Sequence, residues 1–331
     1  MTLAFSFGLI LVGVVVLLFG GDLLIRGAVA LAARWKLPSL LVGLTIVAFG
    51  TSAPELVVSI DAALAGAPGL AVGNIVGSNI ANVLFVLGVP ALFGAIGTST
   101  PGVKRNAAIA LLAGAALIIV GRDGIITLME GGILFALIIV FVSYLALLSR
   151  SRPDDPMVAE LLEAETAPGL PKSAASITVM LLVGVVALPG GAHMIVEGAT
   201  NAAERLGVSD ALIGLTVLAL GTSLPEFATV MVATFRRQAD LAIGNVLGSN
   251  VFNVFAVGGG AAIVGALTGN ELIVDPSFME LDFWVMLGSS ALLMLWILTS
   301  RPIGRVMGGL LFLGYGAYIA ALAYMNNIFL A

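Results

Sequence analysis

Two segments of this chain, residues 43–88 and 214–259, are copies of one motif at a constant offset of 171 residues. The first contains GLTIVAFGTSAPE and LAVGNIVGSNIANV, and the second contains GLTVLALGTSLPE and LAIGNVLGSNVFNV. Each copy carries one glutamate, Glu55 or Glu226, in sequence that is otherwise apolar. Because a carboxylate is costly in hydrocarbon, acids in such segments usually mark an ion pathway. The duplication therefore predicts two halves that share one polar site.

The composition indicates an all-α polytopic membrane protein. The chain is 60% hydrophobic and 10% charged, whereas a soluble domain carries about 25% charged residues. Apolar stretches of about 20 residues predict membrane-spanning helices. The sequence contains ten of them, at 6–32, 39–64, 70–95, 105–121, 126–149, 174–200, 210–235, 240–267, 280–299 and 304–325.

The spans divide into two halves of five. Residues 1–149 form the predicted first repeat and residues 174–331 the second, and the polar segment 150–173 is a predicted linker with a short helix at 157–165. Because each half has an odd number of spans, the second copy enters the membrane from the opposite side, as in secondary transporters built from inverted repeats. An alternative is that the duplication serves helix packing alone.

Basic residues predict the orientation. The loops after odd-numbered spans contain Arg34, Lys36, Lys104, Arg105, Arg150, Arg152, Lys172, Arg236, Arg237, Arg301 and Arg305. The opposite loops contain only Arg122 and Arg205. The positive-inside rule then predicts a multi-pass protein of the cell membrane (plasma or inner), with both termini outside and residues 150–173 in the cytoplasm.

The GTSAPE segment predicts a cluster of oxygen ligands. Pro54 lacks an N–H and clashes with the carbonyl of Gly50, so we expect the helix to open there and free the carbonyls of residues 48–51. Thr51 and Ser52 lie four and three residues before Glu55 and can share its face. The second copy repeats the set with Gly221, Thr222, Ser223, Pro225 and Glu226. Carboxylate, hydroxyl and carbonyl oxygens suit hard cations such as Ca²⁺ or Na⁺.

The second part of each motif predicts a polar stripe. Asn74, Ser78 and Asn82 follow one another at intervals of four, and Asn245, Ser249 and Asn253 repeat the stripe. We interpret the stripes as ion-coordinating, with hydrogen bonding between helices as the alternative. Asn79 and Asn250 face elsewhere and are predicted helix–helix partners. The two inverted motifs can converge at mid-membrane, where two carboxylates would neutralise one Ca²⁺.

The paired GTSxPE and GSNxxN segments in two inverted halves resemble the alpha-repeats of the cation/calcium exchanger superfamily, close to its prokaryotic sodium/calcium exchanger branch. The resemblance implies antiport of Ca²⁺ against Na⁺ by alternating access. It implies that Glu55 and Glu226 bind both ions. It further implies Na⁺ ligands at Thr51, Ser52, Thr222, Ser223 and the carbonyls of Ala48 and Ala219, ligands at Ser78 and Ser249 that reach across to the other half, and Asn82 and Asn253 at the centre.

Position 253 bears on the coupling ions. Several relatives, including archaeal and potassium-dependent exchangers, carry Asp where this chain has Asn253, so we expect exchange that is independent of K⁺. Proton/calcium exchangers of the superfamily tend to have Asn before the Glu, so GTS in both copies favours Na⁺ over H⁺. The alternative is an antiporter of H⁺ and Ca²⁺ or another divalent cation. Three Na⁺ with two carboxylates would leave a positive site, so the stoichiometry stays open.

The residues outside the motif favour a carrier over an enzyme. The chain has one histidine and no cysteine, which argues against an intramembrane hydrolase. We expect no cofactor and no nucleic-acid partner, only the lipid bilayer and the transported Ca²⁺ and Na⁺, and a monomer. The pairs Asp22–Arg26 and His193–Glu197 align at the offset of 171. We interpret them either as a latch on moving helices or as interfacial anchors.

Overall fold

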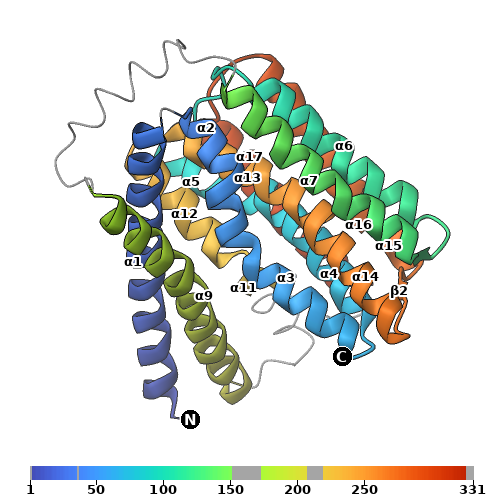
Figure 1. The fold of residues 1–331 in the computed structure, drawn as a ribbon. Coiled ribbons are helices and arrows are strands. Elements are labelled where there is room, and N and C mark those ends of the chain that lie inside the picture. The colour runs from blue at the N-terminus through green and yellow to red at the C-terminus, as the bar shows by residue number, and fades with distance from the viewer. Residues whose placement is uncertain (1, 36, 151–172, 207–218, 326–331) are drawn as a thin grey trace.

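The computed structural model describes residues 2–35, 37–150, 173–206 and 219–325. The described part is almost entirely helical (Figure 1), as expected for a polytopic membrane protein. The helices of its first half are α1 (Leu3–Trp35), α2 (Ser39–Val42), η1 (Gly43–Val47), α3 (Ala48–Leu64), α4 (Pro68–Ala81), η2 (Asn82–Val86), α5 (Gly88–Phe93), α6 (Val103–Gly121) and α7 (Leu128–Arg150).

The later helices begin after the linker region. They are α9 (Ala174–Arg205), α11 (Ala219–Gly221), α12 (Leu224–Phe235), α13 (Ala239–Phe252), η4 (Asn253–Gly258), α14 (Gly259–Thr268), α15 (Ser277–Glu280), α16 (Asp282–Leu298) and α17 (Arg305–Met325). The two short strands β1 (Ile125–Ile126) and β2 (Leu272–Ile273) pair antiparallel, with Ile125 opposite Ile273. They tie the loop before α7 to the loop after α14.

Eight helical segments of the described chain are long and apolar enough to cross a membrane. The remaining apolar helices of intermediate length are α12 and α16, which lie in the predicted seventh and ninth spans. The first helix extends beyond the prediction of 6–32, and α9 continues past residue 200 to Arg205. The predicted linker residues 151–172, with the short helix at 157–165, and span residues 210–218 lie outside the described residues.

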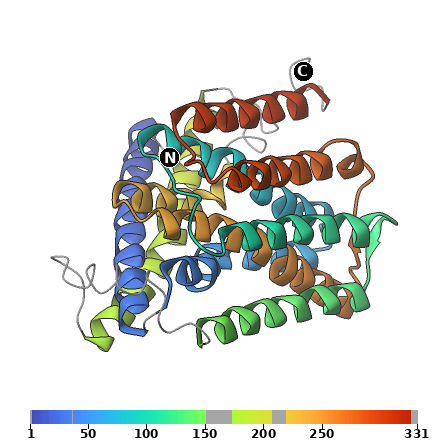
Figure 2. The same cartoon turned by 90° about the horizontal axis from the view of Figure 1, so that it is seen from above.

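Helices α1 and α9 form a closely packed pair at one end of the molecule and run obliquely to the other helices (Figures 1 and 2). A Cβ added at Gly191 would lie 2.7 Å from the Leu17 nitrogen and 2.8 Å from the Gly13 oxygen, so only glycine fits at this crossing. Gly20 and Gly184 allow a similarly close approach further along the same two helices. Small residues allow this packing between helices where lipid supplies no hydrophobic driving force.

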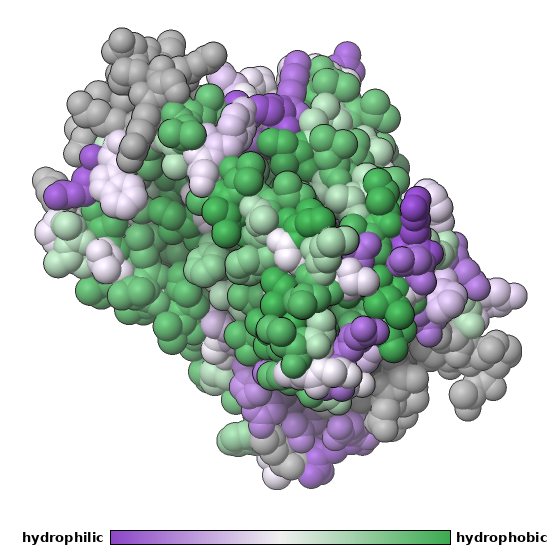
Figure 3. All heavy atoms as spheres, turned by 45° about the vertical axis from the view of Figure 1, so that its right-hand side comes forward, coloured by the Kyte–Doolittle hydropathy of each residue, from purple (hydrophilic) through white to green (hydrophobic). Residues whose placement is uncertain are grey.

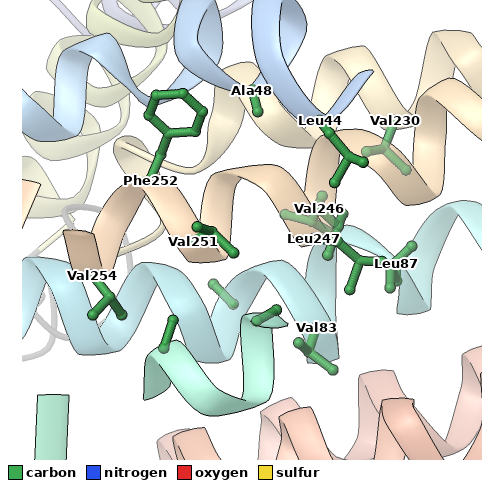
Figure 4. Close-up of a cluster of buried hydrophobic side chains, with 14 of the residues drawn as sticks. Leu44, Ala48, Val83, Leu87, Val230, Val246, Leu247, Val251, Phe252 and Val254 are labelled. Atoms are coloured by element: carbon green, nitrogen blue, oxygen red, sulfur yellow. The ribbon is translucent and has the colours of Figure 1, made fainter. Parts of the chain in front are cut away.

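Helix α13 lies at the centre of the remaining helices. Every residue from Leu241 to Phe252 is buried, and the apolar side chains among them pack against η1, α3, α4 and α12 (Figure 4). The labelled cluster joins Leu44, Val83, Val230 and Val246 from four separate segments. Because α13 is enclosed on all sides, its polar stripe can face only other helices.

The outer surface is apolar, as a bilayer requires. Figure 3 shows a wide hydrophobic area over the middle of one face, with hydrophilic side chains gathered at its edges. Exposed leucines and valines occur along α1, α7, α9, α16 and α17. In a bilayer such side chains contact lipid, whereas polar residues buried among the helices usually mark a functional site.

Candidate functional site

The two motif glutamates are buried in the interior. Glu55 lies in α3 and Glu226 in the first turn of α12, and each is 0% exposed. The Ser52 hydroxyl of the first half donates a 3.2 Å hydrogen bond to Glu226 Oε1 of the second half. Ser249 Oγ donates to the same oxygen at 3.5 Å. The two halves therefore meet directly at one carboxylate.

Several carboxylate oxygens at this site have no hydrogen-bond partner among the described residues. These oxygens are both carboxylate oxygens of Glu55 and Oε2 of Glu226, and all three are buried. Leaving a buried charged oxygen unpaired is strongly unfavourable. A bound cation would satisfy these atoms, and the structure leaves them available for one.

The stripe residues pair across the two halves. Thr51 Oγ1 donates to Asn245 Oδ1 at 3.1 Å and lies 3.4 Å from Ser249 Oγ. In the mirrored arrangement, Thr222 Oγ1 donates to Asn74 Oδ1 at 3.1 Å and lies 3.4 Å from Ser78 Oγ. These contacts relate residues at the same offset of 171. Each motif threonine is thus held by the stripe of the opposite half.

Asn74 and Asn245 also belong to the candidate site, although the family resemblance implies no role for them. Their place in the polar stripes, four residues before Ser78 and Ser249, is the sequence feature that indicates their role. Because each amide oxygen takes the hydroxyl proton of a threonine, the free lone pairs of that hydroxyl can face a cation. Asn74 is anchored by its own donation to the Glu55 carbonyl at 3.2 Å and to Ser59 Oγ at 2.9 Å.

The central asparagines are not equivalent in their contacts. Asn82 Nδ2 donates to Asn250 Oδ1 at 3.0 Å, and Asn82 Oδ1 is buried without a partner. Neither side-chain polar atom of Asn253 has a partner among the described residues. Asn250 also donates to the main-chain carbonyl of Asn79 at 3.4 Å, and Asn79 Nδ2 donates to Met286 Sδ at 3.7 Å, so each of the two side chains makes a contact between helices, as predicted.

The predicted helix opening occurs in one copy only. Around Pro225 the chain leaves helical geometry at Thr222 and Ser223, and α12 begins at Leu224. Around Pro54 the prediction is wrong, because α3 continues from Ala48 to Leu64 with Pro54 inside it. The departure from α-helical geometry lies instead in η1, a π-helical segment that directly precedes α3.

The predicted carbonyl ligands occupy different settings. The Ala48 carbonyl, in the first turn of α3, lies 3.2 Å from Thr51 Oγ1 and competes with Asn245 Oδ1 for its single proton. Ala219 begins the three-residue helix α11. Ser223 precedes α12, and its buried hydroxyl has no partner among the described residues.

A cavity of about 750 Å³ reaches the site from one side. The polar side chains in its wall include Asn74, Ser78 and Thr222, and the apolar ones include Pro54, Val58 and Leu70. The cavity also touches His193 and Val196 of α9, so its wall combines α9 with α3 and α4. It reaches the stripe of the first half at Asn74 and Ser78, whereas neither Glu55 nor Glu226 lines it.

The flanking charged pairs differ between the halves. Asp22 lies 3.5 Å from Arg26 within α1 and also forms an ion pair with Arg236 at the end of α12. His193 Nε2 lies 3.8 Å from Glu197 within α9. Of the two aligned pairs, the first links α1 to α12 by an ion pair, whereas the contact between His193 and Glu197 lies within α9.

Comparison with known proteins places this architecture in a family. The model of the sodium/calcium exchanger protein family matches residues 5–147 and 176–324. The chain belongs to this family. The match covers both copies of the motif and most of the described chain, so this family member carries the family sequence in each half.

The relatives extend over nearly the whole chain. CaxA of Alkalimonas amylolytica is 36% identical to this exchanger-family chain over 315 residues, which cover 93% of the chain and 96% of CaxA. The inner membrane protein YrbG of Escherichia coli (strain K12) is 32% identical and covers 97% of each chain. The solved structure of the sodium-calcium exchanger NCX_Mj soaked with 2.5 mM Na⁺ and 10 mM Sr²⁺ is similar at a TM-score of 0.78 and 30% identity, over 96% of this chain and 99% of that one.

Proposed function

We propose that this family member exchanges Na⁺ for Ca²⁺ across the cell membrane, independently of K⁺, by alternating access. The observation that carries the proposal is the set of unpartnered buried oxygens on Glu55 and Glu226, flanked by hydroxyl and amide groups. Oxygen ligands of these types bind hard cations. The names of the solved relative NCX_Mj and the ions with which it was soaked point in the same direction.

The proposed ligands are the residues of the two motifs. Glu55 and Glu226 hold Ca²⁺ or Na⁺, and Asn82 and Asn253 supply amide oxygens at the centre. The remaining ligands are Thr51, Ser52, Ser78, Thr222, Ser223, Ser249 and the carbonyls of Ala48 and Ala219. The two carboxylates balance the charge of one Ca²⁺, and without a cation they lie buried and mutually repulsive. A site without a cation therefore resists the conformational change that would move it across the membrane. This resistance couples the two ion movements and prevents uncoupled transport.

The proposed topology follows from the inverted motifs. The eight longer and two shorter apolar helices form ten spans in two halves, 1–149 and 174–331, joined by a cytoplasmic linker at 150–173. Both termini then lie outside, and the protein acts as a monomer. Because the chain has no cysteine, single cysteines replacing Lys104 and Arg122 can be labelled with a membrane-impermeant maleimide in spheroplasts. Labelling at position 104 without labelling at position 122 would contradict this orientation.

The coupling ion is tested by measuring ⁴⁵Ca²⁺ uptake into proteoliposomes under imposed gradients. An outward Na⁺ gradient at equal pH is expected to drive uptake, and replacing external choline by K⁺ at matched osmolarity, with the Na⁺ gradient unchanged, is expected to leave the rate unchanged. An outward H⁺ gradient without Na⁺ is expected to drive none. Uptake driven by the H⁺ gradient alone would favour the alternative H⁺/Ca²⁺ antiport, and a requirement for K⁺ would contradict K⁺ independence.

A further inference from the structure

A second, smaller cavity lies on α4 away from the central carboxylates. Its volume is about 210 Å³, and it lies among α4, α15, α16 and α17. Gly73, Val76 and Gly77 of α4 form one wall, and the opposite walls contain Phe278, Asp282, Tyr315, Tyr318, Ile319 and Leu322. Figure 2 shows α17, in red, as an outer layer beside α16. The cavity therefore lies between helices at the periphery of the molecule.

The carboxylate of Asp282 is the charged group of this cavity. Asp282 is the first residue of α16 and is only 9% exposed. It accepts a 2.6 Å hydrogen bond from the Tyr318 hydroxyl. Among the described residues, no basic residue lines the cavity and none forms an ion pair with Asp282. The described residues therefore stabilise this negative charge by one phenol and the helix N-terminus and supply no cation.

Three aromatic side chains line the same cavity as the carboxylate. The Tyr315 and Tyr318 ring centroids lie 6.4 Å apart at an interplanar angle of 52°, and Phe278 adds a third ring to the wall. Aromatic faces attract ammonium groups, and a carboxylate within such a cage provides the counter-charge. A metal cation would need several oxygen ligands at once, whereas the cavity supplies one carboxylate and two phenols. The chemistry therefore favours an organic ammonium group over a metal ion.

The residues around the cavity indicate that it lies at the level of the lipid headgroups in the membrane. Trp284, two residues after Asp282, is 55% exposed, and Tyr324 near the end of α17 is 78% exposed. Exposed Trp and Tyr at helix ends are typical of the membrane interface. The same helices expose Leu292, Leu295 and Leu313 further along. These leucines offer a surface for an acyl chain next to the cavity.

We propose that this cavity binds a primary alkylammonium group, carried by an aminophospholipid headgroup or by a free amine. The ammonium pairs with the Asp282 carboxylate and contacts the rings of Tyr315 and Tyr318. Gly73 and Gly77 also line the larger cavity that contains Asn74 and Ser78. The bound group thus contacts the helix that carries the polar stripe and stabilises its position. This site does not depend on the identity of the coupling ion.

The test measures thermal stability and lipid retention of the purified full-length protein in detergent. Phosphatidylethanolamine is expected to raise the Tm above that in phosphatidylglycerol and to be retained preferentially in native mass spectra. Asp282→Asn keeps an acceptor for Tyr318 and is expected to remove this preference. Glu280→Gln, which removes an exposed acid outside the cavity, is expected to retain it. Each variant loses one negative charge, and the two positions are two residues apart.

Free ethylammonium chloride, compared with NaCl at equal concentration, distinguishes the two sources of the amine. Stabilisation by phosphatidylethanolamine but not by ethylammonium indicates a lipid ligand, and the reverse indicates a free amine. If Asp282→Asn does not fold, Tyr315→Leu provides the second variant, with an expected loss of about tenfold in amine affinity because one ring of the cage is removed. Equal stabilisation by the two lipids with no effect of ethylammonium, or an unchanged preference in Asp282→Asn or Tyr315→Leu, would overturn the proposal.

Discussion

Ser52 donates a 3.2 Å hydrogen bond to the carboxylate of Glu226, 174 residues further along the chain. The equivalent bond from Ser223 to Glu55 is absent, since the Ser223 hydroxyl and both Glu55 oxygens have no partner among the described residues. One carboxylate is therefore held by the protein and the other is bare. The two copies of one motif have different contacts within a single conformation.

Neutralising either central glutamate is expected to abolish Ca²⁺ transport. Glu55→Gln and Glu226→Gln each remove one of the two charges that balance Ca²⁺, and breaking a buried charge pair costs about 3–5 kcal/mol, which corresponds to a loss of about 100-fold or more in affinity. The measurement is ⁴⁵Ca²⁺ uptake together with calorimetric Ca²⁺ binding. Asp61→Asn is the control, because Asp61 is an exposed acid on the same helix. Unchanged transport in both glutamate variants would contradict the assignment of the site.

The two motif serines are expected to differ in their effect on stability. Ser52→Ala removes a hydrogen bond to a carboxylate and should lower the cation-free stability by about 1.5–3 kcal/mol. Ser223→Ala removes a hydroxyl that makes no hydrogen bond within the described residues, so its cost should be smaller. Chemical denaturation in detergent without Na⁺ or Ca²⁺ measures the difference. Equal losses would indicate that the asymmetry does not persist in the cation-free protein.

Asn74 is expected to contribute more stability than Asn245, although the two occupy equivalent positions. Asn74 holds Thr222 and also donates to the Glu55 carbonyl and to Ser59, whereas Asn245 Nδ2 has no partner among the described residues. At about 1 kcal/mol per neutral hydrogen bond, Asn74→Ala should cost about 2 kcal/mol more than Asn245→Ala. Unfolding free energies of the two variants give this difference.

A double-mutant cycle gives the control for this comparison. The pair Thr222→Val and Asn74→Ala should show a coupling energy of about 1 kcal/mol, because the two side chains share one hydrogen bond. The same cycle between Thr222 and Asn245, which are not hydrogen-bonded to each other, should give a value near zero. A coupling of equal size in the two cycles would argue against the specific cross-pairing.

The α1–α9 crossing is expected to reject even one methyl group. Gly191→Ala would place its Cβ 2.7 Å from the Leu17 backbone nitrogen, and overpacking of this kind costs about 1–3 kcal/mol. The neighbouring Gly190→Ala is the matched control, because a Cβ there meets nothing within 4 Å. Thermal unfolding in detergent compares the two variants. If both have the same Tm, the helices are not in contact at this crossing in solution.

The helical fold and much of the site could be predicted from the sequence for physical reasons. A backbone in hydrocarbon must satisfy its own hydrogen bonds, so long apolar stretches become helices whatever their neighbours are. The spacing of three and four residues within GTSAPE then gives Thr51, Ser52 and Glu55 a common helical face. The duplication pointed to two glutamates, and the structure buries both of them in the interior.

The conformation of each motif could not be predicted in this way. GTSAPE and GTSLPE are nearly identical, yet α3 runs through Pro54 while the chain breaks before Pro225. A local rule for proline gives the same answer for both copies, so it had to be wrong for one. The difference depends on what surrounds each motif.

The sequence by itself determined the chemistry of this protein: which segments enter the membrane, and which carboxylates, hydroxyls and amides go with them. Only the tertiary structure decided the partners. Thr51 bonds Asn245, Thr222 bonds Asn74, and Ser52 bonds Glu226. Each contact joins residues more than 100 positions apart. Periodicity along one helix specifies which face a side chain occupies, whereas the packing of all the helices selects the residue that meets it.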